Sequence, residues 1–584
     1  MLPLRVLRPC RSLLHSSTRF SRAYNGATNT TPHPTYFQPP PQPPKSPWRI
    51  GIWSSLLLAT TSLGAGAYAH SWLYDLPLLG IGPGGLEEGE ALPLEAGTMQ
   101  AAMVEAVRSF LANNVPAMDL ERCQEALESG AGYTVTPTAL SHSSQLGSNL
   151  PCEDHWDSGK LCPIIELLFF ASSILSGRVT HPYVGTSDHF GSEGNATNWC
   201  EWSIFDGHAG PRTAQALTMS LAGMVMQGLA DDGCFDRPYS ANDPHTIDTI
   251  KQVFLQADED MVQHTMEQIR SGLPDRAGVV ASAAAAFSGS CALLALYDPV
   301  QHVLRVANTG DSRAVLGRWD GTKYIAHAMS VDQTGFNEME VARITEQHPG
   351  EDVVDPKTGR VHGLAVSRAF GDARWKWPQE VSKRAFEMFW GPSPRPDSMI
   401  KTPPYLTAEP EVTEVVVQTG DHPDFLVMAS DGLWDNMSSD DAISCVQMWL
   451  DKNKPTDFME QQDGGLGAIG AGRQSPNSSP PSLPSILAPV YTTAVDVAEE
   501  DEDVYFDEEE RCLRWRVSPK HFVVEDAHCG VHLIKNALGG KRRDLFTGVM
   551  SVQPPLSRRV RDDITVHVVF FGMDNSKTFE QQGR

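Results

Sequence analysis

The chain has 584 residues, 41% of them hydrophobic, which is enough for one large core or several domains. Its net charge is −26, although residues 1–74 hold seven Lys or Arg and no Asp or Glu. This acidic excess argues against nucleic acid as a partner and is compatible with binding cations. The ten cysteines show no paired spacing, so neither a zinc site nor a disulfide framework is indicated.

The N-terminus has the composition of a targeting segment. Its first 22 residues interleave Leu and Val with arginine and contain no acid, which is typical of a mitochondrial transit peptide. A secretory signal would have an uninterrupted apolar core, and a plain basic tail is the other reading. A Pro-rich spacer follows, so we expect residues 1–47 to be a disordered targeting region.

The stretch Ile50–Ala69 is uncharged and about as long as a bilayer-spanning helix. Arg49 flanks one end, and Trp48 and Tyr68 lie near the two interfaces, as in an aromatic belt. The sequence predicts a single inner-membrane helix here, with the acidic domain in the intermembrane space. A longer targeting region that is cleaved away remains the alternative.

Globular composition begins near Leu92, and residues 92–133 are predicted to form a helical lead-in. Met99–Asn113 has helical spacing, and the runs at 211–229 and 248–270 are predicted to be amphipathic helices. The apolar run Val279–Tyr297 fits a helix or a buried strand by periodicity alone. Its Ser-Gly-Ser and the return at Val303–Ala307 favour two strands joined by a turn. Strand runs and helix runs that are separate indicate an α+β fold.

Two inserts interrupt this pattern. Residues 455–510 are rich in Gly, Pro and Ser and then strongly acidic, so we expect a disordered surface loop. Residues 159–198 contain an apolar run that is too short to cross a membrane. This second segment is either a surface insert or untranslated sequence retained in a gene model, and both readings stay open.

Several acids stand at the edges of strand-like apolar runs. Asp206, Asp431 and Asp562 are far apart in the chain, so only the fold can gather them. Three carboxylates with backbone and water oxygens would make a site for two Mg²⁺ or Mn²⁺ ions. Two such ions can lower the pKa of a shared water molecule and direct it at a phosphorus atom. His208, close to Asp206, would protonate the departing alkoxide. Any one of these acids alone would be read as a turn residue.

The acids occur within five motifs. In chain order, the motifs are Asp206-Gly-His, Gly310-Asp311-Ser-Arg, Ser367-Arg-Ala-Phe-Gly-Asp372, Ser430-Asp431-Gly-Leu-Trp-Asp435 and Arg561-Asp-Asp-Ile-Thr565. With these motifs in this order, the chain resembles the PPM family of metal-dependent Ser/Thr phosphatases (protein phosphatase type 2C).

The resemblance covers residues 134–571 apart from the inserts, with 572–584 as a tail. It implies a β-sandwich of two antiparallel sheets flanked by helices, with a dinuclear metal site at one end.

The resemblance also implies roles for individual residues. Asp206 would bridge two metal ions and Gly207 would supply a carbonyl ligand. Asp431 and Asp562 would bind the second ion, and His208 would act as the acid. Together these residues would make a phosphoserine and phosphothreonine hydrolase.

A second group of residues matches supporting positions in the family. Glu153 and Asp154 match a pair that orders metal-bound water. Asp311 and Asp435 match positions linked to a weaker third metal ion. Asn149 stands where many members have a phosphate-binding arginine, so we expect weaker binding of small phosphoesters.

Several stretches resemble the pyruvate dehydrogenase phosphatase branch of the family: residues 148–154, 368–377, 402–412 and 532–538. The branch implies a phosphoprotein substrate in mitochondria, with the pyruvate dehydrogenase complex as the lead, and an enzyme in the matrix or anchored to the inner membrane. The alternatives are other inner-membrane or intermembrane-space phosphoproteins as substrates, and an inactive binding module with the same fold.

Overall fold

The computed structural model describes residues 117–160, 199–237, 240–271, 275–456, 501–508 and 511–572. Outside these ranges lie the predicted transit peptide, the span at Ile50–Ala69, the helix at Met99–Asn113, most of both inserts and the tail after residue 572. In the part of the chain that the structure describes, no helix is long and apolar enough to cross a membrane.

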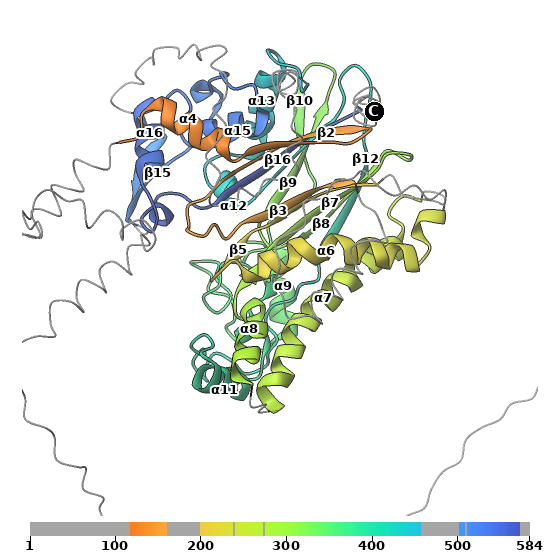
Figure 1. The fold of residues 1–584 in the computed structure, drawn as a ribbon, viewed down its shortest axis with the longest axis vertical. Helices are drawn as coiled ribbons and strands as arrows, with labels where there is room; N and C mark the ends of the chain where they lie inside the picture. The colour runs from red at the N-terminus through yellow and green to blue at the C-terminus, as the bar shows by residue number, and fades with distance from the viewer. Residues whose placement is uncertain are drawn as a thin grey trace, which may run out of the picture. The chain divides into compact units, whose positions relative to one another are not determined.

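Two antiparallel sheets form the centre of the described chain (Figure 1). The first sheet contains, in spatial order, β1 (Ala131–Val135), β2 (Ala139–Leu146), β16 (Ile564–Phe571), β13 (Phe425–Ala429), β9 (Arg313–Trp319) and β10 (Tyr324–Ala328). The second contains β12 (Glu411–Val416), β8 (Val303–Thr309), β7 (Ala292–Asp298), β4 (Cys200–Phe205) and β3 (His155–Lys160).

Apolar side chains from both sheets meet in one core. Strand β7 contributes Leu293, Ala295 and Tyr297 to this core, which also contains Leu426 and Val569 of the first sheet. The alternate β7 residues face the other way, toward the helices that cover the second sheet. Because both faces of β7 are buried, its sequence is a continuous apolar run whose periodicity could not identify a strand.

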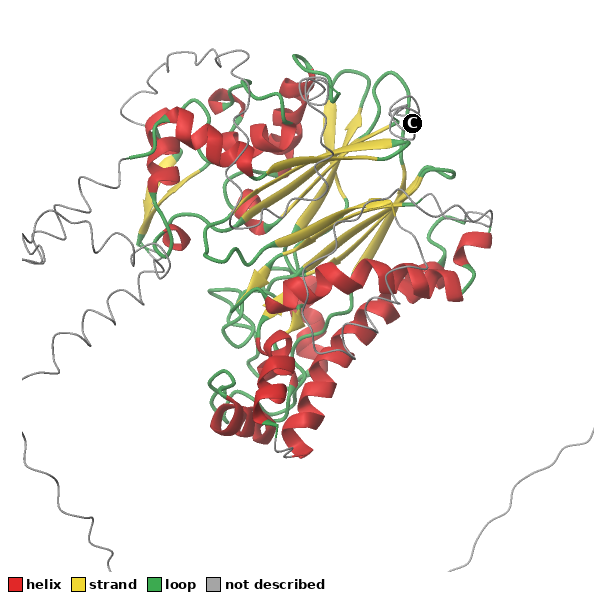
Figure 2. Ribbon diagram, in the orientation of Figure 1, coloured by secondary structure: helices red, strands yellow, loops and turns green. Residues whose placement is uncertain are grey.

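Helices cover the outer face of each sheet (Figure 2). The second sheet is covered by α6 (Arg212–Asp231) and α7 (Pro244–Ser271), and α8 (Arg276–Phe287) and α11 (Gln379–Phe389) pack on α7. The first sheet is covered by α4 (Leu120–Ser129), α13 (Ser439–Leu450), α15 (Cys529–Ala537) and α16 (Arg543–Ser551).

The shorter elements connect these layers. They are β5 (Gly207–His208), β6 (Gly289–Ser290), β11 (Phe370–Gly371), β14 (Val504–Asp507), β15 (Cys512–Trp515), α9 (Glu338–Gln347), α10 (Ala373–Lys376), α12 (Asp431–Trp434), η1 (Cys234–Asp236), η2 (Pro519–His521) and η3 (Ser557–Arg559).

The predicted α+β class with antiparallel sheets and helices is confirmed, as are the two helices now seen as α6 and α7. The hairpin of β7 and β8 is also present. The prediction was wrong for the first half of the run at Val279, which belongs to helix α8. Asp275 caps this helix by accepting a hydrogen bond from the Gly278 amide at 2.9 Å, and its alanine-rich body favours a helix.

The expectation of a disordered loop up to residue 510 was also wrong at its C-terminal end. Residues 504–507 form β14, which pairs with β15 in an antiparallel ribbon. The acids just before the strand are neutralised, since Asp503 pairs with Lys520 at 2.6 Å and Asp501 with Arg542 at 3.4 Å. These contacts compensate for the charge that had suggested disorder.

The residues that bracket 161–198 are held together by strand pairing. Lys160 of β3 lies opposite Cys200 of β4 in the antiparallel register, and Trp199 is 7% exposed. We predict that replacing residues 161–198 with Asn-Gly, keeping Trp199, leaves the fold intact and raises the free energy of unfolding by about 2 kcal/mol, because the loop to be closed is shorter. Urea unfolding measures this. A variant that does not fold would contradict it.

His567 connects the two sheets from a fully buried position on β16. Its Nδ1 contacts Ser143 Oγ at 2.7 Å, and its Nε2 contacts the Ser203 carbonyl at 3.3 Å. Burial lowers the pKa of His567 to about 4. Between pH 6.5 and 4 the unfolded chain therefore binds a proton that the folded chain does not, so stability falls as pH falls through this window.

We predict that wild type loses about 2 kcal/mol more stability than His567→Gln between pH 8 and pH 5, because glutamine does not titrate. Urea unfolding of both proteins across this range measures the difference. The comparison cancels the titration of the carboxyl groups that both proteins share. Parallel pH profiles would contradict the prediction.

Candidate active site

Three predicted site residues meet at one end of the two sheets. Asp206 follows β4, Asp311 follows β8, and Asp431 begins α12 directly after β13. One carboxylate oxygen from each residue lies within 4.8 Å of those from the other two. Strands β4 and β8 both pair antiparallel with β7 and therefore run in the same direction. Their C-terminal ends thus lie at the same end of the second sheet. The fold thus gathers acids that are separated in the sequence.

Asp562 lies next to this group, at the start of β16. Strand β16 pairs antiparallel with β13, so its first residues lie beside the end of β13 and Asp431. Asp562 is half-buried and forms an ion pair with Arg558. Asp435 lies one helical turn after Asp431, donates its amide to the Asp431 carbonyl at 2.8 Å, and is exposed.

Burial and mutual repulsion dominate the electrostatics of the aspartates. Burial raises the pKa of Asp206, and the charges of Asp431, Asp154 and Asp311 raise it further. Burial and the neighbouring acids Asp311 and Asp435 raise the pKa of Asp431 in the same way. Carboxylates crowded in this way gain stability from a cation with oxygen preference, so the residues present fit Mg²⁺ or Mn²⁺.

Glu153 and Asp154 lie behind the aspartates and are held by hydrogen bonds. Asp154 is 2% exposed and accepts from the hydroxyls of Ser430 and Thr565, both at 2.8 Å. Burial, then the charge of Asp563, raises the pKa of Asp154 to about 7. Glu153 accepts from the Gly210 amide at 2.6 Å. These bonds fix both carboxyl groups next to the cluster.

Glycine is required at position 207 by the close approach of two chain segments. A Cβ atom there would lie 2.4 Å from the Glu153 carbonyl oxygen. The absence of a side chain therefore allows the backbone after Asp206 to pack against the Glu153 loop. That packing places the Gly207 backbone between two predicted groups of site residues.

His208 has a buried carboxylate partner. Its Nε2 lies 2.6 Å from Oδ2 of Asp372, which is 2% exposed. Burial opposes the charged imidazole, but the Asp372 carboxylate, together with the charges of Asp311 and Glu153, outweighs burial and raises the pKa of His208. In the sheet of β5, β6 and β11, both His208 and Gly371 pair with Gly289. A Cβ on Gly289 would lie 2.2 Å from His208 Nε2, so this glycine makes room for the contact.

Asp372 was not predicted as a site residue, although its Arg-Ala-Phe-Gly-Asp motif was noted. The motif contains this acid, but nothing in the motif indicates that the acid contacts His208. The predicted third-metal pair is divided in the structure. Asp311 lies within the central cluster and accepts from Cys291 Sγ at 3.3 Å, whereas Asp435 lies at its exposed side.

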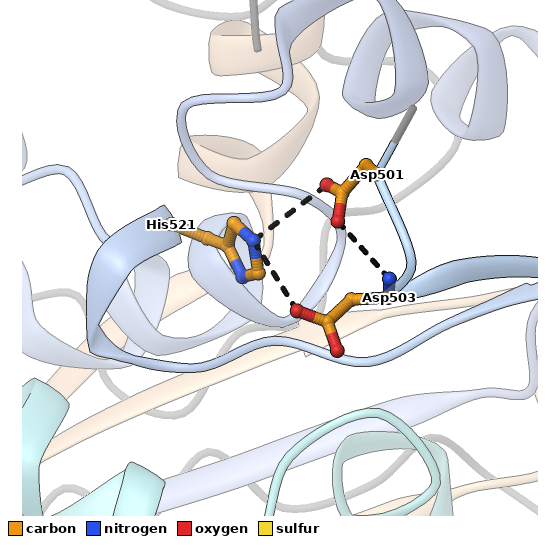
Figure 3. Close-up of side chains that lie close together, drawn as sticks. All are labelled: Asp501, Asp503 and His521. Atoms are coloured by element: carbon orange, nitrogen blue, oxygen red, sulfur yellow. Dashed lines mark hydrogen bonds and ion pairs between the residues drawn. The ribbon is translucent and has the colours of Figure 1, made fainter. Parts of the chain in front are cut away.

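A second acid and histidine cluster, which the sequence did not reveal, lies beside β14 (Figure 3). His521 Nε2 lies 3.6 Å from Asp501 Oδ2 and 3.7 Å from Asp503 Oδ2. The Ser518 amide donates to His521 Nδ1 at 3.2 Å, so in the neutral ring Nε2 carries the proton. A protonated nitrogen cannot bind a metal ion, and Lys520 and Arg542 already neutralise the two acids. This cluster anchors β14.

The chain is similar to known phosphatases. A family model described as protein phosphatase 2C matches residues 185–462, which include Asp206, Asp311 and Asp431. A protein phosphatase 2C homologue of Schizosaccharomyces pombe is 36% identical over 382 residues, covering 64% of this chain and 74% of that protein.

Two further relatives are named mitochondrial pyruvate dehydrogenase (acetyl-transferring) phosphatase 1. The protein from Saccharomyces cerevisiae is 34% identical over 386 residues, covering 64% of this chain and 62% of that protein. The protein from Bos taurus is 32% identical over 314 residues, covering 51% of this chain and 50% of that protein. The chain thus spans between half and two thirds of the length of these two relatives.

Proposed function

Because this chain belongs to the protein phosphatase 2C family, we propose that it hydrolyses phosphoserine and phosphothreonine in proteins with two bound Mg²⁺ or Mn²⁺ ions. The observation that carries the proposal is the convergence of Asp206, Asp311 and Asp431 from three strand ends to within 4.8 Å. Three carboxylates suit hard divalent cations such as these. Among the residues that the structure describes, this cluster contains no cysteine or histidine ligand.

The ligand assignment that we propose is the one implied by the family resemblance. Asp206, the Gly207 carbonyl, Asp431 and Asp562 would hold the two ions. When bound, the ions supply an activated water and neutralise charge on the phosphoryl oxygens.

The remaining acids support the bound ions. Glu153 and Asp154, held by the hydrogen bonds described above, would orient water at the bound ions. Asp311, in the central cluster, and Asp435, at its exposed side, would each contribute to a weaker third site.

His208 donates the proton that the leaving oxygen needs. Its Nε2 is held by Asp372, so Nδ1 is the nitrogen that would donate the proton to the leaving group. The carboxylate raises the pKa of the imidazole, which favours its protonated form, and holds the ring through the hydrogen bond to Nε2. Asp372 thus acts through His208 and is a positioning residue.

The substrate that we propose is phosphorylated pyruvate dehydrogenase in mitochondria. The names of two relatives and the arginine-rich N-terminus support this assignment. A catalytic domain in the intermembrane space could not reach a complex in the matrix. The proposal therefore requires that Ile50–Ala69 be removed, or be tolerated during import into the matrix. Protease treatment of intact and outer-membrane-ruptured mitochondria tests this, since degradation on rupture alone would contradict a matrix location.

The activity is tested with purified protein, an aryl phosphate and a phosphoserine peptide, with and without Mn²⁺. We expect hydrolysis of both substrates that stops when the metal is chelated and returns when it is added back. No hydrolysis at excess Mn²⁺, in protein that binds the metal, would overturn the proposal in favour of a binding module.

A further inference from the structure

Arg558 lies beside the acidic centre. It is the middle residue of η3, and its Nη1 forms an ion pair with Oδ1 of Asp562. Burial and neighbouring acids raise the pKa of Asp206 and Asp431, and the charge of Arg558 acts on both in the opposite direction. The guanidinium therefore lies within electrostatic range of three proposed metal ligands.

The backbone of η3 is fixed, whereas the Arg558 side chain is accessible. Ser557 is fully buried, and its hydroxyl donates to the Ser148 carbonyl at 2.5 Å. Asp563 accepts from the Asn149 amide at 3.0 Å and from the Glu153 amide at 2.8 Å. The Arg558 side chain itself is 41% exposed. A rigid element thus presents a movable cation at the solvent side of the cluster.

Two neighbouring residues, Arg313 and Asn149, cannot provide a movable positive charge at this position. Arg313 is held by Asp332, with Nε 2.8 Å from Oδ1, and its guanidinium lies 5.0 Å from the ring centre of Trp434. The Asn149 side chain is uncharged and donates to Glu153 Oε2 at 2.9 Å. Arg558, by contrast, pairs with Asp562, which is itself a proposed metal ligand.

Metal binding changes the balance of charge around Arg558. Two divalent ions bound to these carboxylates would compete with the guanidinium for Asp562 and would reduce the negative charge that attracts it there. A phosphomonoester dianion then becomes its most favourable partner, and the planar guanidinium can donate two parallel hydrogen bonds to phosphoryl oxygens.

We propose that Arg558 is a phosphate-binding residue that pairs with Asp562 in the metal-free protein and moves to the substrate's phosphoryl group when metal ions bind. This proposal rests on the proposed phosphatase function. It also implies that Arg558 competes with a metal ion for the Asp562 carboxylate, because the guanidinium and the ion cannot occupy the same position.

The test compares Arg558→Gln and Arg558→Lys with Arg559→Gln, which removes the same charge from the next, exposed position of η3. Calorimetry measures Mn²⁺ binding to each protein, and then inorganic phosphate binding to the Mn²⁺-loaded protein. Steady-state kinetics with a phosphoserine peptide gives KM and kcat.

We expect Arg558→Gln to bind Mn²⁺ about threefold to tenfold more tightly and phosphate about tenfold more weakly, with KM raised by a similar factor. Arg558→Lys should bind Mn²⁺ like wild type and show an intermediate loss of phosphate affinity, because lysine lacks the planar fork. Arg559→Gln should stay within about twofold of wild type in every measurement.

Tighter Mn²⁺ binding with unchanged phosphate binding in Arg558→Gln would overturn the proposal, because the arginine would then only neutralise Asp562. Equal behaviour of Arg558→Gln and Arg559→Gln would overturn it as well. The binding measurements need no turnover. A wild type that binds Mn²⁺ and phosphate but hydrolyses nothing would therefore overturn the proposed function alone, and Arg558 would still be judged by its effect on phosphate.

Discussion

Asp206→Asn is expected to lower Mn²⁺-dependent phosphatase activity by at least about 10³-fold, because it removes a proposed metal ligand from the central cluster, where Asp431, Asp154 and Asp311 act on it. The same substitution should make the metal-free protein more stable, since one member of a repelling, buried group loses its charge. Wild type should gain thermal stability on adding Mn²⁺, and the variant should gain far less. The measurements are initial rates and melting temperature with and without Mn²⁺.

The matched control is Asp421→Asn, which removes the same charge from an exposed loop before β13. It should leave activity and the Mn²⁺-dependent gain in melting temperature unchanged. Opposite effects of Asp206→Asn on activity and on metal-free stability separate a metal ligand from a residue that only supports the fold. If metal-free Asp206→Asn were less stable than wild type, the argument from carboxylate repulsion would be wrong.

The sequence predicted the acids of the site better than their surroundings. Asp206, Asp311 and Asp431 stand directly after apolar strands, so their motifs are local and readable. The partner of His208 was not readable, because its contact with Asp372 depends on how three very short strands align around Gly289. Arg558 gave no signal either, since an arginine near an acid in the sequence is most often a surface ion pair.

The same division between local and distant causes applies to the fold. Helices α6 and α7 were predicted from apolar residues that recur on one face, which is a local property. Helix α8 was misread because an apolar, alanine-rich run fits a buried strand or a buried helix equally well. The ribbon of β14 and β15 was missed because its acids are neutralised by Lys520 and Arg542, which lie in a different part of the sequence.

His208→Gln is expected to slow hydrolysis of a phosphoserine peptide by about 10²- to 10³-fold, because a serine alkoxide is a poor leaving group that needs a proton. An aryl phosphate has a much better leaving group, so the same variant should lose less than about tenfold on it. Asp372→Asn should show the same dependence on leaving group with a smaller loss, because it only orients the ring and supports its charge.

Gly289→Ala provides an independent route to the same result. Its Cβ would fall 2.2 Å from His208 Nε2 and 2.3 Å from Asp372 Oδ2, so it must push His208 and Asp372 apart. Neither of these two residues is itself replaced. We expect its losses to follow those of Asp372→Asn across aryl phosphates of increasing leaving-group pKa. The exposed His327→Gln is the control and should be without effect. Equal losses on good and poor leaving groups in His208→Gln would show that the imidazole is not the proton donor.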